Sequence, residues 1–264
     1  MTLREGQKSN AVRRFSRWRS LSSAPIVRAA MRSSRPPRTA AVPPDLRRRF
    51  GQRLRAWFRA HGRDLPWRRT RDPYRILVSE LMLQQTQVGR VLERYDDFLR
   101  RFPTMESVAR SRPTRVMEAW AGLGYYARAR NLHALARTVT SGAGVLPTEP
   151  TELRRLPGIG PYTAGAVASF AYERRAPLVD TNVARVLRRV FAPRLDTRTA
   201  HGQRTLWAIA DAVLPRNGRA SWTHNQALIE LGALVCTARV ARCDVCPVSA
   251  LCRSARGRRR GRIS

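Results

Sequence analysis

Residues 156–164 read Leu156-Pro157-Gly158-Ile159-Gly160-Pro161-Tyr162-Thr163-Ala164. A short helical pattern precedes this stretch, and a second helix is predicted to begin at Pro161, because proline is tolerated in a first turn. Gly158 and Gly160 permit left-handed backbone angles and carry no side chain. The amides of such a turn, with the positive end of the next helix dipole, can bind a phosphate oxygen. The stretch therefore predicts a helix-hairpin-helix, which holds a DNA backbone without reading its sequence.

The charge of the chain favours nucleic acid as a partner. The 264 residues carry a net charge of +33, and the pI is near 11.9. Such a field attracts a polyanion, with nucleic acid ahead of an anionic membrane. Arginine-rich codon usage explains why Lys8 is the only lysine, but it does not create the excess over acids. No apolar run reaches the ~18–20 residues of a membrane span, so no membrane partner is expected.

The apolar periodicity predicts an all-α protein with little strand alternation. We expect a first helix from Asp45 to about Ala60 and a second from about Tyr74 to Gly89. Further helices are predicted at 90–101, 104–110, 113–121, 126–141, 151–156, from 161, and at 182–191, 202–213 and 222–235.

Both ends of the chain are basic and lack a helical period. Residues 1–43 are rich in Arg, Ser, Pro and Ala and predict a disordered arm. Two alternatives are an organelle transit peptide and a translation start near Met31. Residues 254–264 predict a frayed basic tail.

Two acids are candidates for chemistry on DNA. Glu80 lies in an otherwise apolar helical stretch, where burial would raise its pKa toward that of a useful general acid. Gln84 falls one turn later on the same face with Gln85 beside it, and amides suit the reading of base edges. Asp180 stands at the start of the 182–191 helix, where it can also be the N-cap. The alternative for Glu80 is a solvent-facing position on an amphipathic helix.

A second glycine pair presents aromatic and basic side chains. Gly122 and Gly124 predict a tight turn, followed by Tyr125-Tyr126-Ala127-Arg128-Ala129-Arg130. An aromatic wedge in the base stack, with arginines on phosphates, is one way in which enzymes expose a base. The alternative is that one of the two tyrosines lies in the core.

All four cysteines lie in one short segment, with the spacing Cys236-x6-Cys243-x2-Cys246-x5-Cys252. Clustered cysteines favour a metal site in a reducing compartment over a disulfide scaffold. A zinc site usually has two Cys-x-x-Cys pairs and this segment has one, so an iron–sulfur cluster is preferred, although the spacing leaves zinc open.

Together these motifs resemble the helix-hairpin-helix DNA glycosylase superfamily, and within its endonuclease III-like branch the MutY-type adenine DNA glycosylases. The resemblance covers roughly Asp45 to Arg253, and its most specific pieces are 79–88, 122–133 and the cysteine spacing. It implies removal of adenine mispaired with 8-oxoguanine or guanine in double-stranded DNA. Alternatives are a thymine glycosylase acting on G·T mispairs and a non-catalytic DNA-binding protein.

The resemblance also implies a role for each site residue. Glu80 matches the acid that protonates adenine, and Asp180 the carboxylate that stabilises the sugar cation. Tyr162 and Asn182 match residues that support that carboxylate. Trp67, Arg68 and Gln226 match residues that line the adenine pocket, with Gln84 nearby. Gln85 and Tyr125 match the residues that insert into the duplex. Gly158 and Gly160 match the backbone-binding hairpin.

The implied architecture is two helical domains with the DNA site in the cleft between them. A six-helix domain is expected at 66–174, and a discontinuous iron–sulfur domain at 44–65 and 175–253. The implied cofactor is a [4Fe–4S] cluster held by Cys236, Cys243, Cys246 and Cys252. We expect a monomer in a bacterial cytoplasm, associated with the nucleoid, with mitochondrial and nuclear locations as alternatives.

The reaction is expected to be hydrolysis without efficient lyase chemistry. A lyase needs an amine nucleophile, and the position after Pro161, which is lysine in the lyase branch, is Tyr162. The chain ends soon after Cys252, where many relatives continue into a domain that recognises 8-oxoguanine. We therefore expect weaker discrimination between oxidised and normal guanine.

Overall fold

The computed structural model describes residues 42–260, with side chains to residue 256. Within this range the chain is helical, without a strand, as the periodicity predicts. The first helices are α1 (Pro44–His61), α2 (Pro73–Leu83), α3 (Val88–Arg101), α4 (Met105–Arg110), α5 (Pro113–Ala119) and α6 (Ala127–Ser141). Those that follow are α7 (Pro150–Leu153), α8 (Pro161–Tyr172), α9 (Thr181–Phe191), α10 (Ala200–Val213), α11 (Gly218–Leu234) and α12 (Arg253–Arg260). Short 3-10 turns lie at Pro66–Arg68 and Ser249–Leu251.

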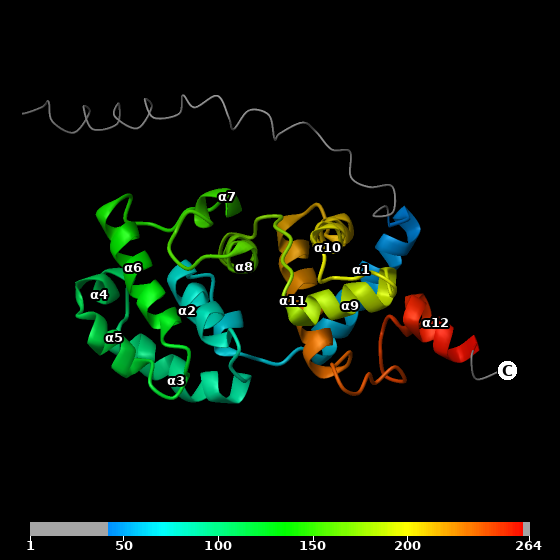
Figure 1. The fold of residues 1–264 in the computed structure, drawn as a ribbon, viewed down its shortest axis with the longest axis horizontal. Coiled ribbons are helices and arrows are strands. Elements are labelled where there is room, and N and C mark those ends of the chain that lie inside the picture. The colour runs from blue at the N-terminus through cyan, green and yellow to red at the C-terminus, as the bar shows by residue number, and fades with distance from the viewer. Residues whose placement is uncertain (1–41, 261–264) are drawn as a thin grey trace, which may run out of the picture. The chain divides into compact units, whose positions relative to one another are not determined.

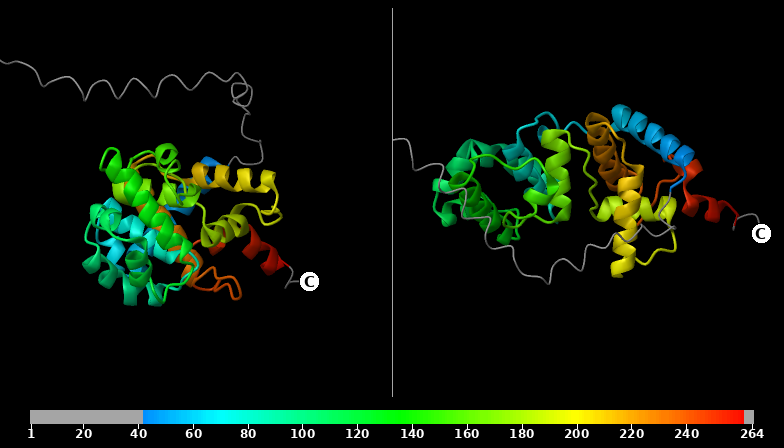
Figure 2. Two further views of the ribbon diagram at one scale, coloured as in Figure 1. Left: turned by 60° about the vertical axis from the view of Figure 1, so that its left-hand side comes forward. Right: turned by 90° about the horizontal axis from the view of Figure 1, so that it is seen from above.

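The helices pack as two groups (Figures 1 and 2). In the first group α2 packs on α3, α6 and α8, while α4 and α5 pack on α6 and α7 packs on α8. In the second, α1 packs on α10 and α11, and α9 packs on α10, α11 and α12. Helix α11 also contacts α8, so the hairpin helix touches both groups. The predicted domain boundaries stay predictions.

Helix α8 forms the centre of this packing because it is apolar on nearly every side. Its residues from Thr163 to Ala171 are all buried, and a helix apolar all round belongs in a core. A Cβ at Gly165 would lie 2.3 Å from the carbonyl oxygen of Pro177, so the chain beyond α8 crosses it at backbone contact. This crossing carries the chain from the hairpin toward Asp180.

Four predictions about helix ends are wrong. The helix expected at 222–235 begins at Gly218, where the Asn217 side chain caps it, and the helix expected at 151–156 ends at Leu153. The helix expected from Tyr74 to Gly89 ends at Leu83, and α3 begins at Val88, because Gln85 adopts a left-handed φ of 55° that no α-helix can contain. The basic tail expected to fray forms α12 (Arg253–Arg260), which packs on α9. Residues 1–41, which hold nearly all of the predicted arm, lie outside the described residues. Among the helices the structure describes, none is both long and apolar enough to cross a membrane.

Candidate active site

Glu80 is a buried acid on α2. Its side chain lies in the core with 4% of its surface exposed, so the solvent-facing alternative is wrong. The hydroxyl of Tyr162, from the first turn of α8, donates a hydrogen bond to Glu80 Oε2 at 2.8 Å. The pKa of Glu80 is raised to about 7, chiefly by burial and also by Asp180, while the Tyr162 hydrogen bond and Arg68 oppose the shift. Glu80 is therefore poised to exchange a proton near neutral pH.

Asp180 caps α9, as its position in the sequence predicts. Its Oδ1 accepts from the backbone N–H of Val183 at 2.7 Å, and its Oδ2 accepts from the Asn182 side-chain amide at 2.9 Å. Burial raises the pKa of Asp180, whereas these hydrogen bonds to Val183 and Asn182 act in the opposite direction. The helix N-terminus also favours the anion, so this carboxylate is held in one orientation with donors on both oxygens.

The structure brings the two acids into one electrostatic neighbourhood. Asp180 acts on the pKa of Glu80, and both acids raise the pKa of Tyr162, after its burial, well above its ordinary value. The resemblance implies that Tyr162 supports Asp180. Its hydroxyl instead donates to Glu80, because the first turn of α8 packs directly on α2.

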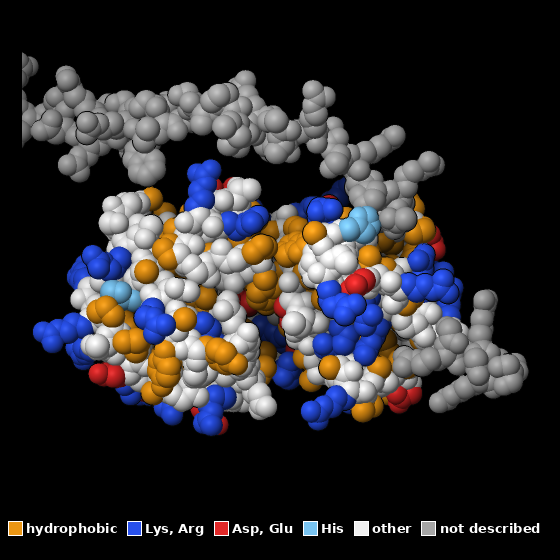
Figure 3. Space-filling model, in the orientation of Figure 1, with side chains coloured by type: hydrophobic (Ala, Val, Ile, Leu, Met, Phe, Trp, Pro, Cys, Tyr) orange, Lys and Arg blue, Asp and Glu red, His pale blue; other side chains and the backbone are white. Residues whose placement is uncertain are grey.

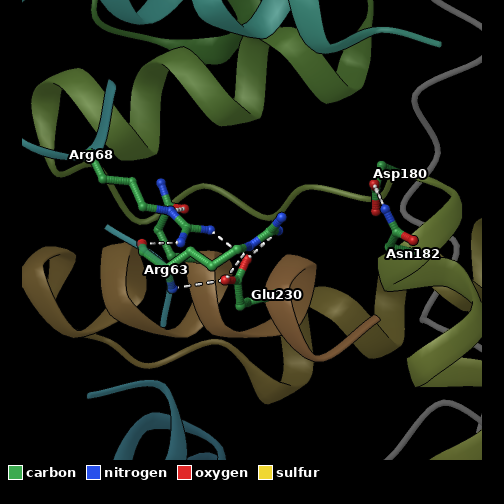
Figure 4. A network of polar contacts seen from close by, with 6 residues as sticks. Arg63, Arg68, Asp180, Asn182 and Glu230 are labelled. Atoms are coloured by element: carbon green, nitrogen blue, oxygen red, sulfur yellow. Dashed lines mark hydrogen bonds and ion pairs between the residues drawn. The ribbon is translucent and has the colours of Figure 1, made fainter. Parts of the chain in front are cut away.

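A polar network joins the chain before α2 to helix α11 (Figure 4). Arg68 donates through Nε to Gln226 Oε1 at 2.8 Å and through Nη2 to Glu230 Oε2 at 2.9 Å. Arg63 donates to the same carboxylate with its backbone N–H at 2.9 Å and with Nε and Nη2 at 2.8 Å. Trp67 is buried edge-on against Tyr95. The predicted pair Arg68 and Gln226 is thus in direct contact.

Arg63 and Glu230 were missed by the sequence analysis. Burial disfavours the charge on Glu230, but the hydrogen bonds from Arg63 and Arg68 outweigh it and lower the pKa of Glu230 to about 2. Residues 63 and 230 are far apart in the sequence, and no local pattern links them. The one available signal was an acid in the apolar pattern of α11, the same signal that singled out Glu80.

The hairpin turn between α7 and α8 has the predicted form, with one difference. Gly158 has a φ of +74°, but Gly160 has an ordinary φ of −85° as the N-cap of α8, which Pro161 begins. A Cβ on Gly158 would lie 2.6 Å from Asn131 Cβ, whereas one on Gly160 would meet nothing within 4 Å. Gly158 is therefore required by conformation and by packing, while the space at Gly160 is open in front of a helix N-terminus.

Gln84, Gln85 and the tyrosine pair lie in two neighbouring turns. Gln84 Nε2 donates to Thr163 Oγ1 at 3.2 Å, on α8 one residue after Tyr162. Gln85 is exposed, as are Tyr125 and Tyr126 at 61% and 41%, so the alternative with one tyrosine in the core is wrong. The core aromatic of this segment is Trp120, which packs edge-on against Phe98.

Arg128 does not face solvent, although we expected it, like Arg130, to contact phosphate. It is buried and donates to backbone carbonyls of the two turns, including those of Leu81 and Leu123, both at 2.9 Å. Arg130 is exposed.

The four cysteines line one mostly apolar cavity between α9, α11 and the C-terminal loop. Arg189 donates to Cys236 Sγ at 3.3 Å, and the Cys252 thiol donates to the Arg189 carbonyl oxygen at 3.3 Å. As the side chains stand, no group of three or more His, Cys, Asp or Glu within the described range could hold a single metal ion. The donor set is all thiol, which suits iron–sulfur ligation or zinc, and a cation beside it suits thiolate charge.

Arg185 connects the cysteine loop to the Asp180 cap. Its Nε donates to the Cys236 carbonyl oxygen and its Nη2 to Asn182 Oδ1, both at 2.7 Å. Asn182 in turn donates to Asp180. A continuous chain of hydrogen bonds therefore runs from the cysteine segment to the carboxylate.

Arginine dominates the charged groups on the face drawn in Figure 3.

Residues 78–210 match the family model of the HhH-GPD superfamily base excision DNA repair proteins. The chain belongs to this superfamily. The matched range contains Glu80, the hairpin and Asp180, so it spans both acids described above.

The chain is similar to several curated adenine DNA glycosylases. The chain is 40% identical over 225 residues to the adenine DNA glycosylase of Rattus norvegicus, covering 81% of this chain and 43% of that protein. It is 45% identical over 197 residues to that of Mycobacterium tuberculosis, covering 74% and 64%, and 41% identical over 215 residues to that of Homo sapiens, covering 78% and 39%. The chain thus spans between about two fifths and two thirds of the length of these relatives.

Solved structures have the same fold. A thermostable thymine-DNA glycosylase matches with a TM-score of 0.74 and 30% identity, covering 81% of this chain and 98% of that one. A trapped endonuclease III–DNA covalent intermediate matches with a TM-score of 0.67 and 24% identity, covering 80% and 96%, and supports the fold alone.

Proposed function

We propose that this chain is an adenine DNA glycosylase that hydrolyses the N-glycosidic bond of adenine mispaired with 8-oxoguanine or guanine. The observation that carries the proposal is the buried Glu80, with a pKa of about 7, in the same electrostatic neighbourhood as the capped Asp180. Cleavage of a glycosidic bond needs a proton donor for the leaving group and a negative charge beside the sugar cation. The names of the curated relatives support the same activity.

Glu80 would supply the proton. A carboxyl with a pKa near 7 is substantially protonated at neutral pH and remains acidic enough to give the proton up. Transfer to a ring nitrogen of the adenine leaves Glu80 as an anion, which the Tyr162 hydroxyl stabilises by its hydrogen bond. Tyr162 is in this way a supporting residue for Glu80.

Asp180 would stabilise the positive charge that develops on the sugar. Its two oxygens are already bonded to Val183 N–H and Asn182, so the anion needs little reorganisation during the reaction. The two acids would then have distinct roles, Glu80 as the proton donor and Asp180 as the stabilising anion, since both oxygens of Asp180 accept N–H hydrogen bonds.

The base pocket is proposed to contain Trp67, Arg68 and Gln226. Arg68 holds the Oε1 of Gln226, which orients the amide N–H groups of Gln226 away from Arg68 and toward any bound acceptor. Gln84, bonded to Thr163, would lie on the α2–α8 side of that pocket.

Double-stranded DNA would bind in the cleft between two helical domains, at 66–174 and at 44–65 with 175–253. The open space at Gly160, in front of the α8 N-terminus, suits a phosphate, and Gly158 gives the turn its shape. The exposed Gln85 and Tyr125 would enter the base stack beside the mispair. We expect a monomer, with a nucleoid-associated location in a bacterial cytoplasm.

We propose hydrolysis without efficient lyase chemistry, because the residue after Pro161 is Tyr162, whose hydroxyl is hydrogen-bonded to Glu80. Lys8, the only lysine of the sequence, lies outside the described residues. Arginine keeps its proton and cannot form a Schiff base.

Cys236, Cys243, Cys246 and Cys252 are proposed to hold a [4Fe–4S] cluster. They share one cavity, and Arg189 lies against Cys236. Burial raises the pKa of the Cys246 thiol to about 11, so ligation would displace a proton that the bare protein retains. The cluster would order the loop that follows α11, since hydrolysis of a base transfers no electrons.

A second candidate is a thymine glycosylase acting on G·T mispairs, which the structural match to a thymine-DNA glycosylase favours. Single-turnover assays on A·8-oxoguanine, A·G and T·G duplexes, with wild type, Glu80→Gln and Asp180→Asn, separate the candidates. We expect wild type to release adenine and both variants to lose this activity. Release of thymine alone would establish the second candidate. If wild type binds DNA but releases neither base, the chain is a non-catalytic DNA-binding protein.

A further inference from the structure

Arg128 is a buried cation in the first turn of α6, next to the two turns that carry Gln85 and Tyr125. A buried guanidinium is rare unless its donors are satisfied. Its terminal nitrogens donate to backbone carbonyl oxygens of both turns, those of Leu81 (2.9 Å), Met82 (2.8 Å), Gln84, Leu123 (2.9 Å) and Gly124 (3.0 Å). One side chain therefore joins the C-terminal end of α2 to the turn before α6.

Each of the two turns contains a strained residue. Gln85 has a φ of 55° and Tyr125 a φ of 46°, in the left-handed region that residues with a side chain seldom adopt. Such a conformation persists only where the surroundings impose it, and it concentrates at functional sites. Both side chains are exposed, so burial of these side chains does not explain the strain.

The Arg128 guanidinium also contacts side chains in and beside the two turns. Its Nη2 donates to Thr86 Oγ1 at 3.1 Å, and Thr86 Oγ1 lies 3.3 Å from the Leu123 carbonyl oxygen. The guanidinium carbon lies 5.4 Å from the ring centroid of Tyr125 and 5.6 Å from that of Trp120. Arg128 thus contacts the residues on either side of Gln85, the ring of Tyr125 and the core beneath the turns.

We propose that Arg128 is a positioning residue that holds Gln85 and Tyr125 at a fixed separation, so that both enter the duplex together when the target base is extruded. The proposal rests on the proposed function, since it concerns the insertion step of that site. The guanidinium fork is required because it bonds several acceptors at once, whereas a lysine ammonium is a single point with three donors. Lysine would keep the charge but would not hold both turns.

The test compares Arg128→Lys with Arg137→Lys, an identical change at an exposed position of the same helix. On an A·G duplex we expect Arg128→Lys to lower the single-turnover rate about 30-fold, a loss comparable to that of one or two charge-assisted hydrogen bonds. On adenine opposite an abasic site the loss should be under about 3-fold, because an unpaired base is already easy to extrude. Arg137→Lys should match wild type on both.

A structural defect would lower both rates equally, and that result, or an unchanged rate on the A·G duplex, would overturn the proposal. If Arg128→Lys fails to fold, Thr86→Val tests the same linkage. This change keeps the shape of the side chain but removes Thr86 Oγ1, which accepts a hydrogen bond from Arg128 and donates one to the Leu123 carbonyl oxygen. We expect a smaller loss with the same dependence on the substrate, and equal rates for Thr86→Val and wild type on the A·G duplex would refute the linkage.

Fluorescence of 2-aminopurine placed next to the mispaired base tests insertion without chemistry. In the Glu80→Gln protein, DNA binding should raise the fluorescence as stacking is lost, and adding Arg128→Lys should remove most of the rise. If wild type releases no adenine but the fluorescence still depends on Arg128, the proposed function fails and the positioning role stands. If adenine is released and the rise is independent of Arg128, the positioning role fails alone.

Discussion

The Tyr162 hydroxyl donates to Glu80 Oε2 at 2.8 Å, so the first turn of the hairpin helix α8 lowers the pKa of the buried acid on α2 against the effect of its burial. The contact links the hairpin turn to the acid through two residues of α8, Pro161 and Tyr162. If the proposed function holds, phosphate binding at the hairpin and proton donation by Glu80 both involve α8.

Removal of this hydrogen bond should move the pH profile of the reaction. The bond stabilises the ionised form of Glu80 and lowers its pKa, which nevertheless stands at about 7 because burial raises it more. The wild-type single-turnover rate should therefore fall above about pH 7, and Tyr162→Phe should shift the inflection to higher pH. Tyr172→Phe, which deletes a hydroxyl bonded to Leu146, is the control. A shift to lower pH would contradict the assigned role of Tyr162.

Glu80→Gln should abolish excision yet stabilise the protein at alkaline pH. The folded pKa of about 7 lies above the ordinary glutamate value of 4.5, so the folded state binds the extra proton between these two pH values. Stability from this group is complete below pH 4.5 and is lost as the pH rises to 7. Urea unfolding at pH 8 should show the variant more stable by up to about 3 kcal/mol, with little difference at pH 4.5. A variant less stable at pH 8 would contradict the buried-acid account.

Glu230→Gln should destabilise the protein by about 3 kcal/mol at pH 7, because it leaves Arg63 and Arg68 partly buried without their anion. The pKa of Glu230 is lowered to about 2, so its contribution is present above pH 4.5 and is lost as the pH falls toward 2. Glu173→Gln is the matched control, since its ion pair with Arg71 is exposed and should be worth less than about 1 kcal/mol. If Glu230→Gln and Glu173→Gln lower the free energy of unfolding in urea by equal amounts, the buried network contributes no more stability than the exposed ion pair.

Asp180→Asn should separate capping from catalysis. Asparagine caps helices well, so its oxygen can still accept from Val183 N–H, and thermal stability should change by less than about 1 kcal/mol. The charge beside the sugar is lost, and the single-turnover rate should fall by about 1000-fold or more. A rate within tenfold of wild type would remove Asp180 from the chemistry.

Cys246→Ser should lose bound iron and, with it, DNA binding. Wild-type protein is expected to contain about four irons and four sulfides per chain. Asp244→Ser, an exposed change in the same loop, should retain both. Because Arg185 connects Cys236 to Asn182, any Cys246→Ser protein that still binds DNA should also show a reduced excision rate. Full iron content in Cys246→Ser would contradict the ligand assignment.

The helical class, the hairpin at Gly158, the burial of Glu80 and the cap at Asp180 were all predictable from the sequence. Each depends on a short-range rule: apolar periodicity, a glycine turn, or an acid within an apolar helix face. The break between α2 and α3 was not predictable, because the apolar periodicity runs on through Gln85. The left-handed turn at Gln85 lies beside the Gln84 carbonyl oxygen, which accepts a hydrogen bond from Arg128, more than 40 residues later.

What the sequence determined by itself was local: where helices begin, which side chains avoid water, and which residues carry protons or thiols. Only the tertiary structure decided the hydrogen-bond partners. Tyr162 bonds to Glu80, and Glu230 accepts from Arg63 and Arg68. Arg128 bonds to the backbone of two turns, where the sequence had predicted contact with phosphate. The physical reason is that a buried charge must be satisfied by whatever the packing of distant helices brings within hydrogen-bond reach. That packing is a property of the whole chain.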